Sequence, residues 1–259
     1  MDLELTGKRA VVCGGSRGLG LACAHALARE GVNLTLVARK RDDLAAAAQS
    51  LKAEYNIGIA VVSADLASPE ARHAVHRACP DPDILILMTP RLSEGRAAVV
   101  SQDGIQNGLM AGLISPLHLA LAIVEGMCDR RFGRIVTILG SSTKAPLPSH
   151  MLTNISRTGL AAGLASLARE TARFNVTVNN VLTGPAETEG LVATWSARAA
   201  ARGSTVETLR TEAIARIPAG RLARPDEVAA LCIALCGSRF GHLTGQSIVV
   251  DGGALPGLF

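Results

Sequence analysis

The sequence predicts an α/β fold: a Rossmann-type doubly wound parallel sheet of about seven strands between two helical layers, a three-layer αβα arrangement. Short apolar runs alternate with longer helical stretches along the 259 residues, as strand–helix–strand units do. The run at 83–88 is continuously apolar after its first residue, which is typical of a strand buried on both faces. Glycines follow the first apolar run and open the first helical stretch, as in a nucleotide-binding unit.

The elements can be assigned in order from these patterns. Runs rich in Val, Ile and Leu predict strands at 9–13, 33–38, 59–63, 83–88, 134–139, 176–182 and 247–250. Stretches rich in Ala and Leu predict helices at 21–30, 42–55, 104–128, 153–174 and 225–236. Pro116 is expected to bend the third of these helices.

The same pass along the chain predicts its organisation. No linker or internal repeat divides the sequence, so residues 1–259 are expected to form a single domain. Residues 186–217 are polar and helical without a strand. We interpret them as an insertion that forms a lid over the substrate side of the sheet.

Composition excludes several classes of protein. Hydrophobic residues make up 48% of the chain and charged residues 19%, which is too apolar for intrinsic disorder. Aromatic residues make up only 2%, including Trp195 and Tyr55, and the net charge of +4 is spread along the chain, so no nucleic-acid partner is predicted. The apolar runs are interrupted short of a membrane span. The six cysteines lack metal-like spacing, which favours reduced thiols in a cytoplasmic protein without a metal site.

The residues that follow the first and second predicted strands indicate a dinucleotide-binding site. Gly14, Gly18 and Gly20 let the backbone approach a pyrophosphate at the positive end of the first helix. The second strand ends in a basic turn that begins at Arg39, where an enzyme that binds NAD would carry an acid. Together with Arg17, this turn favours the 2′-phosphate of NADP(H), and a solvated basic turn is the alternative.

With these residues the chain resembles the classical short-chain dehydrogenase/reductase family, and within it the 3-oxoacyl-acyl-carrier-protein reductases. The turn at 13–20 resembles the family's T-G-x-x-x-G-x-G, with Cys13 in place of Thr. Further matches cover nearly the whole chain, at 65–66, 178–181, 183–188, 217–221, 225–229, 244–246 and 251–253. The resemblance implies that Asp65 contacts the adenine and Thr188 the nicotinamide amide. It also implies a homotetramer or homodimer paired through the two long helices.

All four catalytic positions of the family are changed in this chain. The family's Tyr, Lys, Ser and Asn positions hold Thr153, Arg157, Gly140 and Gly112. Thr153 and Arg157 are four residues apart and so share a helix face. Arg157 can donate hydrogen bonds to a ribose and carries a positive charge, but it does not release its proton as a general acid. A threonine hydroxyl is too weak an acid to replace the tyrosine.

The loop before Thr153 resembles a divergent subgroup of the family that carries K-x-P-x-P followed by T/S-N-x-x-R in place of Y-x-x-S-K. Lys144 is the hypothesised proton donor if it is partly buried, and an exposed loop lysine is the alternative. Ser141 and Ser142 either orient a carbonyl oxygen or cap the loop. His150 is a second candidate for proton transfer, with a solvent-facing loop histidine as the alternative.

These observations predict an NADP(H)-dependent short-chain oxidoreductase that acts on a small-molecule carbonyl or alcohol through a non-standard proton relay. The alternatives are a lyase, isomerase or dehydratase on the same fold, or a non-catalytic partner subunit. The predicted catalytic residues are Ser141, Ser142, Lys144, Thr153 and Arg157. The predicted cofactor-binding residues are Gly14, Ser16, Arg17, Gly18, Leu19, Gly20, Arg39, Asp65, Leu66, Thr89, Arg157 and Thr188.

Overall fold

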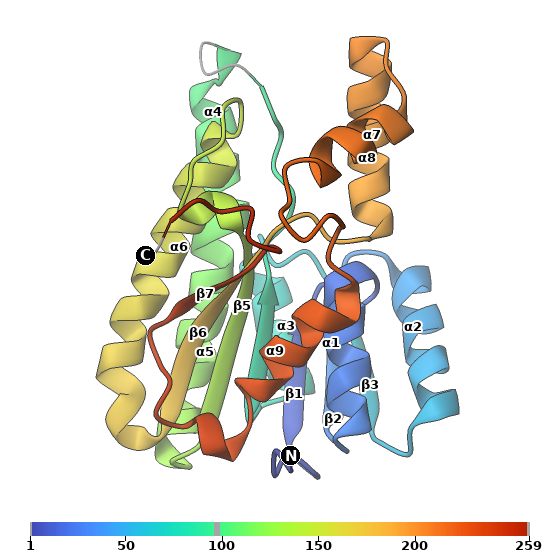
Figure 1. Ribbon diagram of the computed structural model, residues 1–259. Coiled ribbons are helices and arrows are strands. Elements are labelled where there is room, and N and C mark those ends of the chain that lie inside the picture. Colours follow the sequence, from blue (N-terminus) through green and yellow to red (C-terminus); the bar gives the residue numbers. More distant parts are fainter. Residues whose placement is uncertain (1, 96–98, 258–259) are drawn as a thin grey trace.

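A seven-stranded parallel sheet forms the centre of the molecule (Figure 1). The computed structural model describes residues 2–95 and 99–257. The strands are β1 (Arg9–Cys13), β2 (Asn33–Ala38), β3 (Ile59–Ser63), β4 (Ile84–Met88), β5 (Gly133–Gly140), β6 (Val176–Thr183) and β7 (Ser247–Val250). Their order is β3-β2-β1-β4-β5-β6-β7, which confirms the predicted doubly wound sheet. The order reverses between β1 and β4, where folds of this kind bind ligands beyond the carboxyl ends of the strands.

Helices cover both faces of the sheet (Figure 1). They are α1 (Gly18–Arg29), α2 (Arg41–Glu54), α3 (Pro69–Ala78), α4 (Gln102–Leu109), α5 (Ser115–Asp129), α6 (Met151–Thr171), α7 (Glu189–Arg202), α8 (Val206–Ile214) and α9 (Pro225–Ala234). One face buries apolar side chains of α1, α2 and α9, and the other buries those of α3, α5 and α6. Each face of the sheet therefore carries its own apolar core cluster. Successive side chains of a strand point to opposite faces, so Val12 of β1 belongs to the first cluster, with α1, α2 and α9, and Val11 belongs to the second, with α3, α5 and α6.

Helix α3 was not predicted from the sequence. It is polar, and Val75 is its only buried residue. Its start carries a local signal, because the side chain of Ser68 accepts the Ala71 N–H (3.1 Å) and Pro69 occupies the first turn. A search for N-terminal caps, rather than for apolar periodicity, would have found this helix.

The predicted lid range is helical, and its helical part is divided into two helices, α7 and α8. Gly203, with φ of +61°, ends α7 in the left-handed conformation that favours glycine. Thr188 and Thr205 cap the starts of α7 and α8 through their side chains. The helix pair stands beyond the carboxyl ends of the strands, opposite α4 (Figure 1).

The long helix predicted at 104–128 begins earlier and contains a π-helical segment. That segment, Met110–Ile114, lies between α4 and α5, and the Ser115 N–H donates to the carbonyl of Met110. Pro116 follows directly and has no N–H to donate to the carbonyl of Gly112. The irregular turn therefore lies immediately before the proline that was expected to bend the helix.

By length and composition, the whole stretch Gln102–Asp129 is apolar enough to cross a membrane. The sequence interpretation did not anticipate this. In the fold, Leu119, Ile123 and Met127 of this stretch are buried in the second core cluster. Packing against the sheet accounts for this apolar character, as it does for core helices that pass the same test.

Candidate active site

The turn between β1 and α1 requires glycine, at some positions for its backbone conformation and at others for lack of space. Gly14 and Gly18 have φ of +72° and +55°, a region that favours glycine. A Cβ on Gly20 would lie 2.2 Å from the carbonyl oxygen of Gly14. The Gly14 N–H donates to Val37 on β2 (2.7 Å), which fixes the turn against the neighbouring strand. The resulting cradle is a close backbone approach of the kind that a pyrophosphate requires.

The start of α1 is open for an anion. Arg17 occupies the cap position without a side-chain cap, and the first turn contains no acidic residue. Unpaired N–H groups and the helix dipole at such an end favour negative charge. Ser16 and Leu19, the other predicted residues of this turn, are half-buried beside it. The turn therefore fits the phosphates of a dinucleotide.

The ends of β2 and β3 present the groups predicted for the adenosine half. Arg39 follows β2 and is exposed, as is Arg17 in the glycine turn. Asp65 follows β3 and accepts the Ala67 N–H (3.0 Å), and Leu66 beside it is half-buried. Because β1, β2 and β3 are parallel neighbours, these residues and the glycine turn lie at the same edge of the sheet.

Thr89 and Thr188 are the residues that the sequence predicts for the nicotinamide side of the site. Thr89, directly after β4, is buried, and its hydroxyl has no hydrogen-bond partner among the described residues, so it is available to a bound group. A Cβ on Gly18 would lie 3.5 Å from the Cγ2 atom of Thr188. The Thr188 hydroxyl accepts the Leu191 N–H (3.2 Å) and so caps α7. The glycine turn and the lid therefore meet at Thr188.

Arg157 lies directly beside Gly140. Its Nη1 atom lies 2.8 Å from the position that a Cβ on Gly140 would take, and the Ser142 hydroxyl lies 3.4 Å from the same point. Gly140 stands where the resemblance expects the family's serine. Burial, and then the nearby charge of Arg91, lower the pKa of Arg157 to about 10, so its guanidinium is charged near neutral pH. A half-buried cation therefore lies where the resemblance predicts a hydroxyl.

A second glycine, Gly112, lies equally close to a side chain of α6. Gly112, at the family's Asn position, lies in the π-helical segment and is buried. A Cβ there would lie 2.7 Å from Oγ and 2.9 Å from Cβ of Ser156. The Ser156 hydroxyl donates to the Leu152 carbonyl of its own helix (2.7 Å). The two helices are thus packed too closely for an asparagine at position 112.

We predict that Gly112→Ala lowers the free energy of unfolding by about 1–3 kcal/mol, because it overpacks this contact. Chemical denaturation would measure the loss. In a Ser156→Gly background, Gly112→Ala is expected to cost ~1 kcal/mol less free energy of unfolding, because residues in direct contact are coupled by about this amount. Gly163→Ala is the matched control, since its Cβ would lie 3.5 Å from Leu117, an ordinary contact. Equal losses in both backgrounds would contradict the packing argument.

The other predicted catalytic residues lie around the start of α6. Thr153 is buried at 6% exposure, and Ser142 at 7%. Ser141, directly before Ser142, is half-buried. Lys144 is exposed, so the partial burial on which the proton-donor hypothesis depended is not observed. The Thr158 hydroxyl donates to the Thr143 carbonyl (3.3 Å), which fixes this loop beside Arg157.

Three charged or titratable side chains connect the lid to the sheet edge. Arg198 of α7 donates two hydrogen bonds to Glu94 (2.9 and 2.6 Å). His150 lies 3.3 Å from Glu94 through Nε2 and 2.8 Å from the Pro148 carbonyl through Nδ1. Burial raises the pKa of Glu94, but Arg198 outweighs it, and the net pKa is below its usual value. His150 therefore makes a structural contact with the lid and does not project into solvent.

The sequence interpretation missed Glu94 and Arg91, which follow β4. Arg91 donates a hydrogen bond to the Thr194 hydroxyl of α7. Thr194 and Arg198 share a face of α7 because they are four residues apart. Their partners lie more than one hundred residues away in the sequence, so only the position after the end of β4 could have singled them out.

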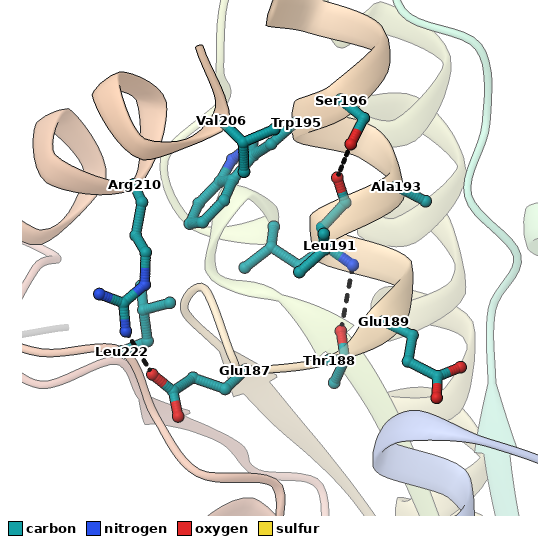
Figure 2. Close-up of a pocket in the computed structure, with 11 residues that line it drawn as sticks. Glu187, Thr188, Glu189, Leu191, Ala193, Trp195, Ser196, Val206, Arg210 and Leu222 are labelled. Carbon is teal, nitrogen blue, oxygen red and sulfur yellow. Dashed lines mark hydrogen bonds and ion pairs between the residues drawn. The ribbon is translucent and has the colours of Figure 1, made fainter.

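A cavity of about 560 Å³ lies between α7 and α8, and the predicted cofactor-binding residue Thr188 is among the residues that line it. Figure 2 shows Trp195, Leu191 and Val206 around it. Arg210 pairs with Glu187 at its side (2.8 Å). None of the predicted catalytic residues lines it. The described residues contain no cluster of three or more His, Cys, Asp or Glu side chains that could hold a metal ion.

The fold and the cradle together define a dinucleotide-binding α/β protein. The family model described as enoyl-(acyl carrier protein) reductase matches residues 14–254. The chain therefore belongs to the short-chain dehydrogenase/reductase family, as its motifs predicted.

Similar proteins share the full length of the chain. A 3-oxoacyl-[acyl-carrier-protein] reductase of Vibrio harveyi is 29% identical over 97% of this chain and 98% of its own. The acetoacetyl-CoA reductase of Shinella zoogloeoides is 30% identical over 94% of this chain and 97% of its own. The crystal structure of L-sorbose reductase from Gluconobacter frateurii, solved with NADPH and L-sorbose, has a TM-score of 0.94 at 29% identity and covers 100% of both chains.

Proposed function

We propose that this protein is an NADP(H)-dependent oxidoreductase that reduces a carbonyl group or oxidises an alcohol through a non-standard proton relay. The position of Arg157 carries the proposal, because its guanidinium fills the space of the missing serine next to a fitting nucleotide cradle. NADPH in the structure of the similar L-sorbose reductase and the absence of an acid at the end of β2 support the choice of cofactor.

In this proposal the chain holds the nucleotide at the glycine turn, with Arg17 and Arg39 at the 2′-phosphate and Thr89 and Thr188 near the nicotinamide. The bound cofactor supplies the hydride. Arg157 stabilises negative charge on the reacting oxygen, and it also reaches the ribose. The hydroxyls of Ser141, Ser142 and Thr153 orient that oxygen.

Lys144 stays the proposed source of the proton, although it is exposed and not partly buried as the hypothesis required. Its ammonium group is a stronger acid than the hydroxyls of the predicted set. It follows Ser142 in the loop that Thr158 holds beside Arg157. Because Lys144 is exposed, it regains its proton directly from water. The proton therefore enters from the open side of the site.

The lid and the subunit arrangement are further parts of the proposal. The α7–α8 pair would close over the substrate, since Arg91 and Glu94 already join α7 to the sheet edge. Met110, Leu121, Met151 and Ile155 are exposed apolar residues on the two long helices. They support pairing of identical subunits through these helices. A cytoplasmic location also stays a prediction.

Two measurements test the function. Fluorescence titration with NADPH and NADH is expected to show binding with preference for NADPH, and absorbance at the reduced nicotinamide band is expected to show turnover with a panel of aldehydes and ketones. Failure to bind either nucleotide would reject the proposal. Nucleotide binding without redox turnover, but with elimination or isomerisation of a substrate, would favour the lyase or isomerase alternative. Turnover only in the presence of a co-purified paralogue would favour the partner-subunit alternative.

Arg157→Leu and Lys144→Ala are predicted to impair turnover differently. Loss of the Arg157 cation should lower kcat by ~10²–10³, as removal of an oxyanion donor does, and should also weaken NADPH binding. Loss of Lys144 should lower kcat by at least ~10² without changing the Kd for NADPH, as expected for a general acid. Lys52→Ala, an exposed lysine on α2, is the control. Unchanged turnover in Lys144→Ala would remove this residue from the relay.

A further inference from the structure

Arg198 of α7 contacts two separate segments of the chain. Its Nε and Nη2 atoms donate to the two carboxylate oxygens of Glu94 (2.9 and 2.6 Å), which follows β4. The same Nη2 atom lies 3.2 Å from Nε2 of His150, which immediately precedes α6. One guanidinium therefore joins the lid both to the segment after β4 and to the start of the helix that carries Thr153 and Arg157.

The imidazole of His150 is oriented for this contact. Its Nδ1 atom lies 2.8 Å from the Pro148 carbonyl, which only accepts hydrogen bonds, so Nδ1 carries the proton. In the neutral ring Nε2 is then an acceptor, and it takes a hydrogen bond from Arg198. Glu94 also lies 3.3 Å from Nε2, so a protonated ring would donate to the carboxylate instead. In both states the ring keeps a partner in the Arg198–Glu94 pair.

The bond between Arg198 and Glu94 is of the kind that orients both side chains. Exposed pairs with one contact contribute little to stability, but paired bonds between an arginine and a carboxylate also fix their relative geometry. Arg91 adds a second link, because it too follows β4 and donates to the Thr194 hydroxyl on the same face of α7. The position of α7 is therefore tied to the segment after β4.

The backbone of the same segment holds the loop before α6. The Gly95 N–H donates to the Ser149 carbonyl (2.9 Å), and the Asn154 N–H donates to the His150 carbonyl (2.8 Å). Ser149 has φ of +62°, a left-handed conformation that is unfavourable for a serine and persists where surrounding contacts hold it. The bond from Gly95 and the contact of the His150 ring with Glu94 and its partner are such contacts. The start of α6 is thus held from the β4 side.

We propose that Arg198 is a positioning residue, which couples closure of the lid to the alignment of Thr153 and Arg157 at the start of α6. This inference rests on the proposed function and adds to it a residue that acts through its neighbours. When α7 is in place, Arg198 holds Glu94 and His150 together and so fixes the start of α6. When α7 moves away, both contacts are lost at once. The site is therefore complete only while the lid is closed.

Hydrogen exchange of the protein without nucleotide tests this coupling independently of turnover. Arg198→Met is expected to raise exchange ~5-fold or more in α7 and also in residues 147–157. His150→Phe keeps an aromatic ring but removes the acceptor, and it is expected to raise exchange in α7 as well, because a coupling free energy acts equally in both directions. His150→Gln, whose amide oxygen replaces Nε2 as an acceptor, should restore most of the protection.

Arg210→Met is the matched control. Arg210 is also a lid arginine, it bonds to a carboxylate of Glu187 (2.8 Å), and its side chain is 40% exposed against 34% for Arg198. Its ion pair includes no residue of α6 or of the loop before it. The variant should raise exchange in α8 and leave residues 147–157 unchanged. Raised exchange confined to α7 in Arg198→Met would overturn the coupling.

Steady-state kinetics with the panel of aldehydes and ketones separates positioning from simple retention of the substrate. A lid that only retains the substrate would raise KM in Arg198→Met and leave kcat unchanged. Coupling predicts that kcat also falls ~10-fold or more, because misplaced catalytic groups lose rate. His150→Phe should show a similar fall in kcat, and His150→Gln should recover it. An unchanged kcat in Arg198→Met would reject the positioning role.

The outcomes also separate this inference from the function on which it rests. Redox turnover with an unchanged kcat in Arg198→Met would overturn the coupling and leave the oxidoreductase function standing. Reciprocal effects on exchange in α7 and in residues 147–157, in a protein that binds no nucleotide, would reject the oxidoreductase function while the coupling between the lid and α6 itself held.

Discussion

Gly20→Ala is expected to destabilise the protein by about 3 kcal/mol or more and to abolish measurable binding of NADPH. The new Cβ would lie 2.2 Å from the carbonyl oxygen of Gly14 and 2.7 Å from its carbonyl carbon. Both atoms belong to the backbone, so no rotation of a side chain can relieve the contact. Gly14 is held in turn by its hydrogen bond to Val37 on β2 (2.7 Å). The turn must therefore move as a whole, which places this change in the upper range of overpacking effects.

Urea denaturation and NADPH fluorescence titration measure the two effects of Gly20→Ala. Gly190→Ala is the matched control, because Gly190 also lies in the first turn of a helix and its Cβ would meet only the Thr188 hydroxyl at 4.0 Å. That control is expected to be neutral or stabilising by up to ~1 kcal/mol, the difference in helix propensity between the two residues. A Gly20→Ala protein as stable as the Gly190→Ala protein would show that the turn tolerates a side chain.

The glycine turn and the strands could be predicted because their signals are local. A strand such as β4 is identified by five adjacent apolar residues, and the cradle by glycines within one turn of chain. Every predicted strand is present, with its ends within one residue of the structure. Local signals also explain the failures. Helix α3 has a cap but little apolar face, and the break at Gly203 within the predicted lid carries only the signal of a single glycine.

The reaction centre could be predicted only in part, because it depends on contacts between distant segments. The sequence indicates that Gly140 and Arg157 stand at family positions, but not that the guanidinium occupies the space of the absent side chain. The same holds for Gly112 and Ser156. In each pair the two residues lie on different elements of the fold. Each glycine therefore has its side-chain space bordered by a polar side chain of α6.

The lid contacts were also beyond sequence reasoning. His150 was considered as a proton-transfer group because of its residue type. The structure places it against Glu94, which Arg198 already holds. Arg91 offered no motif at all. The sequence shows that these residues are charged, but only the fold shows which charges form ion pairs. Among the described residues, Arg91 and Arg157 have no carboxylate partner.

Arg39→Asp is expected to reverse the choice between NADPH and NADH. Arg39 follows β2 and is exposed, and so is Arg17 in the adjacent glycine turn. The change removes a cation from the proposed 2′-phosphate site and places there the acid that would bind a ribose hydroxyl. NADPH should bind ~100-fold more weakly, from a lost charge-assisted hydrogen bond and new repulsion. NADH should bind equally well or better.

Fluorescence titration of both nucleotides at two salt concentrations tests this reversal. The loss of NADPH affinity should shrink at high salt, because exposed charges are screened. Arg239→Asp makes the same change in net charge at an exposed residue at the opposite edge of the sheet, near the start of β7, and should affect neither nucleotide. If Arg39→Asp weakened both nucleotides equally, Arg39 would hold a group that they share. The 2′-phosphate would then be recognised by Arg17 alone or not at all, and the preference for NADP(H) would lose its physical basis at the end of β2.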